Sequence, residues 1–345
     1  MLRTFGDNIH VTTFDLSTSD HPTDPEFDAI RILPLIDPVE VHSVLDKSPI
    51  RPRARVADVI CFSIIDWTSR YQRPQQMMSQ YAAHGHRVFY IDLVRFRPPS
   101  AEKKVAVNEI KPNIYGISLT SISTPQIYSE VIEGKNLELL MLSLEELRCE
   151  YGINQAVCYI MIASWAPLAL EMRERFGWKI IYDCMDEWEN FPLIKQPVVE
   201  MEESLARDCD LLVVTAARLF DKWQHRRGPT VLARNAADYE FFDERCLPNS
   251  LLGDVAHPIV GYYGAIAEWF DLDLMTAVAE ARPYYTFVII GGVYNVDVSR
   301  LRASHNVRFL GHRPYETMPE YLYHFDACII PFKINQITES TDPVK

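Results

Sequence analysis

The sequence has no apolar run approaching the roughly 18 residues that a membrane-spanning helix needs, and its first residues lack the apolar core of a signal peptide. Its seven cysteines are dispersed and include no C-x-x-C pair, which argues against a disulfide framework and a zinc knuckle. There is no excess of positive charge, because 34 Lys and Arg stand against 47 Asp and Glu. The formal charge of −13 disfavours nucleic-acid binding, which needs basic side chains against phosphates. We predict a cytoplasmic protein that does not bind nucleic acid.

Several enzyme signatures are also missing. No full G-x-G-x-x-G opens a strand-to-helix unit, which disfavours an NAD-dependent dehydrogenase, and there is no G-x-S-x-G, P-loop or kinase signature. His84 and His86 are better explained by a turn before a strand than by a metal pair, and no H-x-x-x-H spacing occurs. We therefore expect no protein-held metal and no permanently bound cofactor.

The composition, with 48% hydrophobic and 23% charged residues in 345, is typical of a globular protein of about two domains. Residues 1–55 show no sustained period and are predicted to be an irregular leader, with a short strand at 31–33. From Asp58 onward, short apolar runs alternate with helical patterns, which indicates a parallel sheet covered by helices on both faces. Strands are predicted at 59–65, 86–92, 156–162, 178–183, 210–215 and 230–234, with helices between them.

The alternation stops at residues 244–258, which contain two prolines and a glycine without any period, and we predict a linker there between a first domain at 56–243 and a second at 259–345. The second series predicts strands at 259–263, 285–290, 307–310 and 327–330. It ends on "FKINQITESTDPVK", whose polar residues 338–342 are of the types that cap a helix N-terminus. We expect a helix to begin there and the second domain to be incomplete.

Candidate ligand-binding residues fall where predicted strands end, which is the edge at which open α/β sheets bind ligands. In the second domain these are Gly261 and Gly264 in "VGYYGAIAEWFD", and Gly291 and Gly292 in "IIGG". Glycines at such turns let the backbone approach a phosphate, although a simple tight turn explains one pair equally well. Two glycine loops at one edge favour a nucleotide site.

The first domain carries "IIDWTSRYQRPQQ" after its first strand. Its polar and aromatic side chains predict an acceptor pocket, although Gln72 and Arg73 could equally cap or pair locally. The segment "YDCMDEWENF" adds Asp183, Asp186 and Glu187, which could act as a base, bind sugar hydroxyls or cap helices. The predicted acceptor residues are Asp66, Trp67, Arg70, Gln72 and Arg73.

Taken in order, several segments resemble the GT-B glycosyltransferases, in particular bacterial family 4-like enzymes of teichuronic acid, capsule and exopolysaccharide synthesis. They are "QRPQQMMSQYAAHGHRVFYID", "YDCMDEW", "DLLVVTAARLFDKW", "RNAADYEFF", "NVRFLGHRPYETMPEYLYHFDACIIPF" and "TESTDPVK". "RNAADYEFF" resembles the family's Asn-Gly-Val-Asp-x-x-x-Phe turn, with Ala236 in place of the usual Gly. The resemblance covers residues 58–345 and implies two Rossmann-like, doubly wound domains that face a cleft, the second being incomplete.

The resemblance implies that the first domain holds the acceptor and the second a UDP- or GDP-sugar as co-substrate. A catalytic role is expected for Asp186 from its place at a strand end, and the resemblance implies one for Glu339, because Glu339 or Ser340 falls near the first acidic position of the family's two-glutamate motif. Ala265 and Phe270 stand where many retaining members have Arg and Lys, so Arg313, Lys333 and Lys345 are expected to supply positive charge, unless the nucleotide binds differently. The implied donor-binding residues are Gly264, Gly291, Gly292, Arg313, Lys333, Thr338, Ser340, Thr341 and Lys345.

The implied function is transfer of a sugar, with retention, to a cell-surface polysaccharide or lipid-linked acceptor. Peripheral contact at the inner face of the membrane would use Arg51, Arg53 and Arg55, although a solvated charge run explains these residues better. An alternative is an incomplete or degenerate relative that binds an acceptor or partner without catalysis, which the missing Arg and Lys favour. A GT-B sugar-nucleotide epimerase is a third reading, against which "QRPQQ" and "TESTDPVK" argue.

Overall fold

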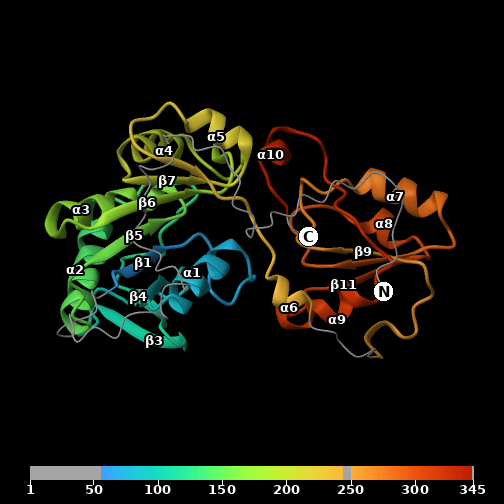
Figure 1. Ribbon diagram of the computed structural model, residues 1–345, viewed down its shortest axis with the longest axis horizontal. Coiled ribbons are helices and arrows are strands. Elements are labelled where there is room, and N and C mark those ends of the chain that lie inside the picture. The colour runs from blue at the N-terminus through green and yellow to red at the C-terminus, as the bar shows by residue number, and fades with distance from the viewer. Residues whose placement is uncertain (1–55, 244–249, 344–345) are drawn as a thin grey trace, which may run out of the picture. The chain divides into compact units, whose positions relative to one another are not determined.

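The computed structural model describes residues 56–243 and 250–343, and these form one compact unit. The predicted leader with its strand at 31–33, and the candidate donor residue Lys345, lie outside the described residues. The described residues form two sheets, which Figure 1 shows in blue to yellow for the first and in orange to red for the second. Both are built mainly from parallel strands.

The first sheet has eight strands in the order β3-β4-β2-β1-β5-β6-β7-β8. All neighbours are parallel except β3 and β4, which form an antiparallel pair. Strands β1 and β2 are fully buried, as their continuous apolar runs predict for strands covered on both faces. The bounds are β1 Asp58–Phe62, β2 Val88–Ile91, β3 Val105–Lys111, β4 Ile114–Leu119, β5 Ala156–Ile160, β6 Lys179–Cys184, β7 Leu211–Val214 and β8 Thr230–Leu232.

Helices pack on both faces of this sheet. Along β1, Val59 and Cys61 point into one apolar cluster, whereas Ile60 and Phe62 point into another, so alternate side chains serve the two faces. Proline at the first turns of α1, α3 and α4 suits helix starts, because the first amides need no partner inside the helix. The bounds are α1 Arg73–Ala83, α2 Gly134–Glu150, α3 Ala166–Phe176, α4 Gln196–Asp208 and α5 Ala217–Trp223.

The second sheet has four parallel strands in the order β11-β10-β9-β12. It too is packed on both faces, because Phe287 and Ile289 of β10 join one apolar cluster and Val288 and Ile290 the other. The strands are β9 Ile259–Tyr263, β10 Thr286–Ile290, β11 Val307–Gly311 and β12 Ala327–Cys328. The helices in this part of the chain are α6 Tyr239–Asp243, α7 Leu272–Ala281, α8 Ser299–Arg302, α9 Met318–Tyr323 and α10 Gln336–Glu339.

The predicted strand and helix alternation matches the structure with several differences, among them the short helices α6 and α8, which were not predicted. Strands β3 and β4 were missed, because β3 is half exposed and lacks the continuous apolar run of its neighbours. Part of the predicted linker packs as core, because Leu252 is only 3% and Val255 only 6% exposed, within a cluster against the second sheet. The mixed α/β, doubly wound fold class is confirmed.

Candidate functional site

Arg73 connects two strand ends of the first sheet, those of β6 and β8. Its guanidinium donates to both carboxylate oxygens of Asp183, at 2.8–3.1 Å, and to the Ala233 carbonyl and the Asn235 side-chain oxygen, at 3.1 and 3.2 Å. The Tyr159 hydroxyl donates to Asp183 at 2.8 Å. Because the Arg73 side chain is only 9% exposed and Asp183 is fully buried, this is an internal ion pair. Arg73 therefore pairs inside the protein, which favours the alternative of a pairing role over that of an acceptor contact.

The other predicted acceptor residues lie on the loop between β1 and α1. The Asp66 carboxylate accepts from the Leu93 amide at 3.0 Å, and burial raises its pKa above the usual value. Gln72 begins α1 in a capping box with Gln75, whose side-chain amide also donates to the Asp66 and Trp67 carbonyls. The Trp67 ring lies edge-on to the Tyr90 ring, with the ring centroids 5.2 Å apart. These contacts hold most of the loop in place.

Aromatic side chains from this loop meet residues around the second sheet. The Tyr71 ring stacks on Tyr315, with centroids 4.6 Å apart, and the Gln76 amide donates to the Tyr315 hydroxyl at 3.0 Å. The Arg70 guanidinium lies 5.6 Å from the centre of the Tyr294 ring. Arg70 is thus the predicted acceptor residue that points toward the second glycine loop.

The structure brings the predicted catalytic residues into one polar cluster. Arg218, which sequence reasoning missed, donates to Glu187 at 3.0 Å and to Glu339 at 3.1 Å. The fully buried Ser340 hydroxyl donates to Glu187 at 2.6 Å. We call Asp186, Glu187, Arg218, Glu339 and Ser340 the carboxylate cluster.

Asp186 is partly buried, and the Thr341 hydroxyl lies 3.5 Å from its carboxylate. Burial raises the pKa of Asp186 to about 7. A carboxyl group with a pKa near neutrality can both release and accept a proton, which is what acid–base chemistry requires. Asp342 adds a contact with Asn235. Its carboxylate accepts from the Asn235 backbone amide at 3.2 Å, and its carbonyl accepts from the Asn235 side-chain amide at 2.9 Å.

Two raised carboxyl pKa values predict how stability depends on pH. Burial raises the pKa of Glu202 to about 7, as it does for Asp186, while the Tyr182 hydroxyl acts in the opposite direction. Between about pH 4 and pH 7 the folded protein keeps protons that the unfolded chain releases, so the free energy of unfolding is expected to fall as pH rises. We expect Glu202→Gln to flatten this fall in urea melts at several pH values. Glu203→Gln, at an exposed neighbour in α4, should leave it unchanged; equal slopes in both variants would contradict the assignment.

Two glycines meet closely at the carboxyl edge of the second sheet. A Cβ on Gly291 would lie 1.8 Å from the Gly264 carbonyl oxygen, and both residues have φ values that favour glycine, at 147° and 148°. Gly261 differs from prediction, because it lies within β9, where the Phe325 ring occupies the space of a side chain. Its role is packing.

A hollow of about 560 Å³, which we call the glycine hollow, opens at this edge. It is lined by Gly291, Gly292, Gly311, Val293, Phe309, Leu310 and Arg302. Arg302 was missed from the sequence because α8, which carries it, is only four residues long. Its guanidinium lies 5.0 Å from the centre of the Phe309 ring, so a cation stands at the mouth of the hollow.

The predicted basic donor residues are dispersed. Arg313 donates to the Tyr321 hydroxyl at 3.1 Å and to the His312 carbonyl, and it does not line the glycine hollow. Lys333 is exposed, and its amide is bonded to the Trp269 carbonyl. Phe270, at a position where the family resemblance leads one to look for a basic residue, is fully buried. Among the described residues of this set, Lys333 is exposed and Arg313 is partly exposed.

The polar run near the end of the described chain differs from expectation. Asn335 caps the short helix α10 by accepting from the Thr338 amide, so Thr338 and Glu339 lie inside a helix, and Ser340 and Thr341 follow it. These residues therefore end one helix, and no second helix begins among the residues described up to 343. Ser340 and Thr341 point to the carboxylate cluster.

Within the described part of the chain, no group of three or more His, Cys, Asp and Glu side chains could hold a metal ion. No helix in that part is long and apolar enough to cross a membrane.

The fold is that of the GT-B glycosyltransferases. Sucrose-phosphate synthase from Thermosynechococcus elongatus superposes with a TM-score of 0.58 at 16% identity, covering 81% of this chain and 77% of that one. Anabaena Alr3699/HepE, solved in complex with UDP and glucose, superposes with a TM-score of 0.54 at 12% identity, covering 79% and 73%. Both similarities concern the fold, and no protein-family model matches the chain.

A curated relative is found in Bacillus subtilis (strain 168), under the name "Putative teichuronic acid biosynthesis glycosyltransferase TuaH". The two sequences are 23% identical over 238 residues, a match that covers 63% of this chain and 58% of the relative. The chain thus spans somewhat more than half the length of that relative.

Proposed function

We propose that the protein is a glycosyltransferase that moves a sugar, with retention, from a UDP- or GDP-sugar to a cell-surface polysaccharide or lipid-linked acceptor, with peripheral contact at the inner face of the membrane. The observation that carries the proposal is the GT-B fold across about four-fifths of the chain, with an open glycine edge in its second sheet. The relative named for teichuronic acid biosynthesis and the UDP complex of HepE support the acceptor and donor classes.

In this proposal the glycine hollow binds one part of the donor nucleotide. Gly264, Gly291 and Gly292 let the backbone approach it closely, and Arg302 offers a charge to an anionic group. Lys333 and Lys345 are proposed to add positive charge, and Thr338, Ser340 and Thr341 to line the donor's path. Neutralising the diphosphate stabilises the leaving group as the bond to the sugar breaks.

The carboxylate cluster is proposed to act at the reacting bond. Retention requires the acceptor hydroxyl to attack the anomeric carbon on the face that the diphosphate leaves; Asp186, with a pKa of about 7, would accept the proton that this hydroxyl loses, and Glu339, held by Arg218, would orient the donor sugar. Asp66, Trp67, Arg70 and Gln72 would present the acceptor, with Arg70 directed toward the glycine loops. Contacts of this kind act by fixing geometry before the chemical step.

A second candidate is a protein that binds an acceptor or partner without catalysis. The observation that favours it is the burial of Phe270 beside Ala265, which leaves no basic side chain at the positions where many retaining relatives carry Arg and Lys. This candidate predicts no binding of nucleoside diphosphates.

The proposal is tested by calorimetric titration of UDP and GDP. The titrations use the 345-residue chain and a longer chain that also includes a segment corresponding to the part of the relative that the match does not cover. We expect Arg302→Ala to weaken nucleoside diphosphate binding about tenfold, because it removes a charged contact. Arg300→Ala is the matched control, since Arg300 lies on the same helix but pairs with Glu280 at 3.5 Å. Absence of binding by both chains would reject the donor reading and favour the second candidate.

A further inference from the structure

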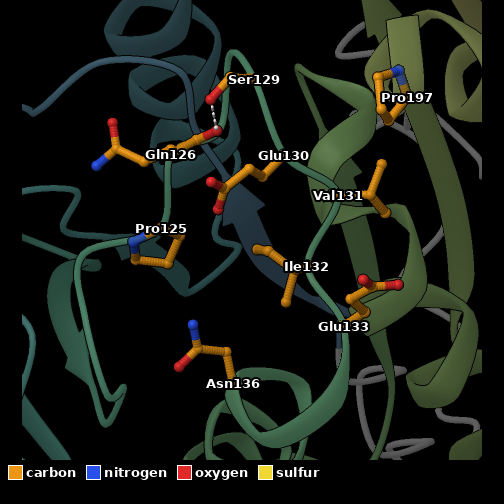
Figure 2. A pocket seen from close by; sticks show the side chains of 9 residues that line it. All are labelled: Pro125, Gln126, Ser129, Glu130, Val131, Ile132, Glu133, Asn136 and Pro197. Atoms are coloured by element: carbon orange, nitrogen blue, oxygen red, sulfur yellow. Dashed lines mark hydrogen bonds between the residues drawn. The ribbon is translucent and has the colours of Figure 1, made fainter. Parts of the chain in front are cut away.

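A second hollow lies on the first domain, away from the residues assigned above. It has a volume of about 340 Å³ and is formed by the loop after β4, the start of α2 and the start of α4. Since β4 runs parallel to β2, this loop leaves the carboxyl edge of the sheet, where ligands of open α/β folds bind. We call it the Asn136 hollow; Figure 2 shows it from close by.

The loop that forms this hollow is held at several points. The Ser164 hydroxyl donates to the Ile127 carbonyl, and the Tyr128 hydroxyl donates to the Ile64 carbonyl at 2.9 Å. The Ile132 amide donates to the Ser164 carbonyl at 3.1 Å. These bonds tie the loop to segments that follow β1 and β5, so the hollow is preformed and a ligand would not have to order it.

One hydrogen-bond donor in the hollow is fixed in direction. The Asn136 side-chain oxygen accepts from the Ile122 amide at 3.0 Å, and the Ser121 hydroxyl, which also donates to the Ser123 carbonyl at 2.6 Å, lies 2.9 Å from it. Because a backbone amide can only donate, the Ile122 bond sets the orientation of the Asn136 amide, and its NH₂ group, which can donate twice, has no protein partner within the described residues. Figure 2 shows this amide and the Glu130 carboxylate on opposite sides of the hollow, with Ile132 between them.

Two carboxylates supply acceptors in the hollow. Glu130 and Glu133 line it, and within the part of the chain that the structure describes neither side chain forms an ion pair or hydrogen bond. No Lys, Arg or His lines the hollow, so it carries negative charge and disfavours an anionic ligand. Ile132, 5% exposed, and two prolines supply apolar surface between the polar groups.

We propose that the Asn136 hollow binds a neutral sugar unit of the acceptor, remote from the bond being formed, an inference that rests on the glycosyltransferase function proposed above. Sugar hydroxyls both donate and accept, so neighbouring hydroxyls can donate to Glu130 and Glu133 and accept from Asn136. A carboxylate that binds vicinal hydroxyls is a known arrangement for ribose. The apolar C–H face of the ring packs on Ile132 and the prolines, and the volume suits one sugar unit.

The test uses the full chain labelled at isoleucine δ1 methyl groups, titrated with maltose, cellobiose, N,N′-diacetylchitobiose, glucosamine and glucuronate. We expect at least one neutral disaccharide to shift the Ile132 methyl signal with a millimolar Kd, and glucuronate to leave it unmoved. Ile289, in the second sheet, serves as the remote reference signal. No shift at Ile132 with any neutral disaccharide, or stronger binding of glucosamine or glucuronate, would overturn the proposal.

Variants assign the binding to the hollow. Glu130→Gln and Asn136→Ala are each expected to raise the Kd about tenfold or more, since each removes a hydrogen bond to the sugar. Glu138→Gln is the matched control, because Glu138 lies nearby on α2 and pairs with Lys135 at 2.6 Å. The Glu130 side chain forms no hydrogen bond or ion pair with the described residues, so its variant should fold even if Asn136→Ala disturbs the loop. Unchanged affinity in Glu130→Gln and Asn136→Ala would reject the site.

Binding of UDP to the same samples separates this inference from the proposed function. Nucleotide binding without any saccharide shift at Ile132 overturns the Asn136 hollow and leaves the glycosyltransferase proposal standing. A saccharide shift at Ile132 without nucleotide binding supports the hollow as a sugar site and counts against the donor half of the proposal.

Discussion

Asp183→Asn is expected to lower the free energy of unfolding by about 3–5 kcal/mol, because it leaves the Arg73 guanidinium buried without a counter-charge. Asparagine has nearly the shape of aspartate, so the loss reflects the charge and not a cavity. The pair is almost completely enclosed, with Arg73 9% exposed and Asp183 fully buried. Urea unfolding followed by circular dichroism measures the change.

The matched control for this pair is Glu150→Gln. Glu150 forms an ion pair with Lys103 at 3.0 Å, but the two side chains are 43% and 66% exposed, so its loss should cost less than about 1 kcal/mol. Combining Asp183→Asn with Arg73→Met should restore part of the lost stability, since no charge is then left buried. A double variant as unstable as the sum of the single ones would mean that the pair acts only through shape.

The alternation of elements could be predicted from the sequence because buried parallel strands need apolar runs on both faces. The strand at 211–214 and the helix that follows it were predictable from "DLLVVTAARLF" alone. Strand β3 was not, since its side chains are partly exposed and their pattern is mixed. Its assignment depends on pairing with β4, which a local reading of the sequence does not contain.

Residues of the candidate site could be predicted only where they lie close together in one segment of the sequence. The polar residues after β1 and β6 follow from strand ends, because parallel strands bring those ends to one edge. Arg73 and Asp183, in contrast, lie 110 residues apart, and nothing local distinguishes a buried ion pair from an exposed arginine. Arg218 was missed for the same reason, because its partners Glu187 and Glu339 come from distant segments. Arg302 was missed because the helix that carries it is only four residues long.

Gly291→Ala is expected to destabilise the second sheet and to abolish nucleoside diphosphate binding. The added Cβ would lie 1.8 Å from the Gly264 carbonyl oxygen, a backbone atom that cannot rotate away, and the φ of 147° is one that side chains rarely adopt. Strain and overpacking together should cost about 3 kcal/mol or more, measured by urea unfolding.

Gly311→Ala is the matched control, since Gly311 lines the same hollow with a φ of 71° but has no atom within 4 Å of its added Cβ. Its cost should be about 1–2 kcal/mol, that of the left-handed backbone alone, with nucleotide binding retained. The difference between the two variants therefore isolates the contact between the two glycine loops from backbone strain. Equal losses of stability would show that this contact yields without cost, and the glycine hollow would then have no rigid edge on which to hold a nucleotide.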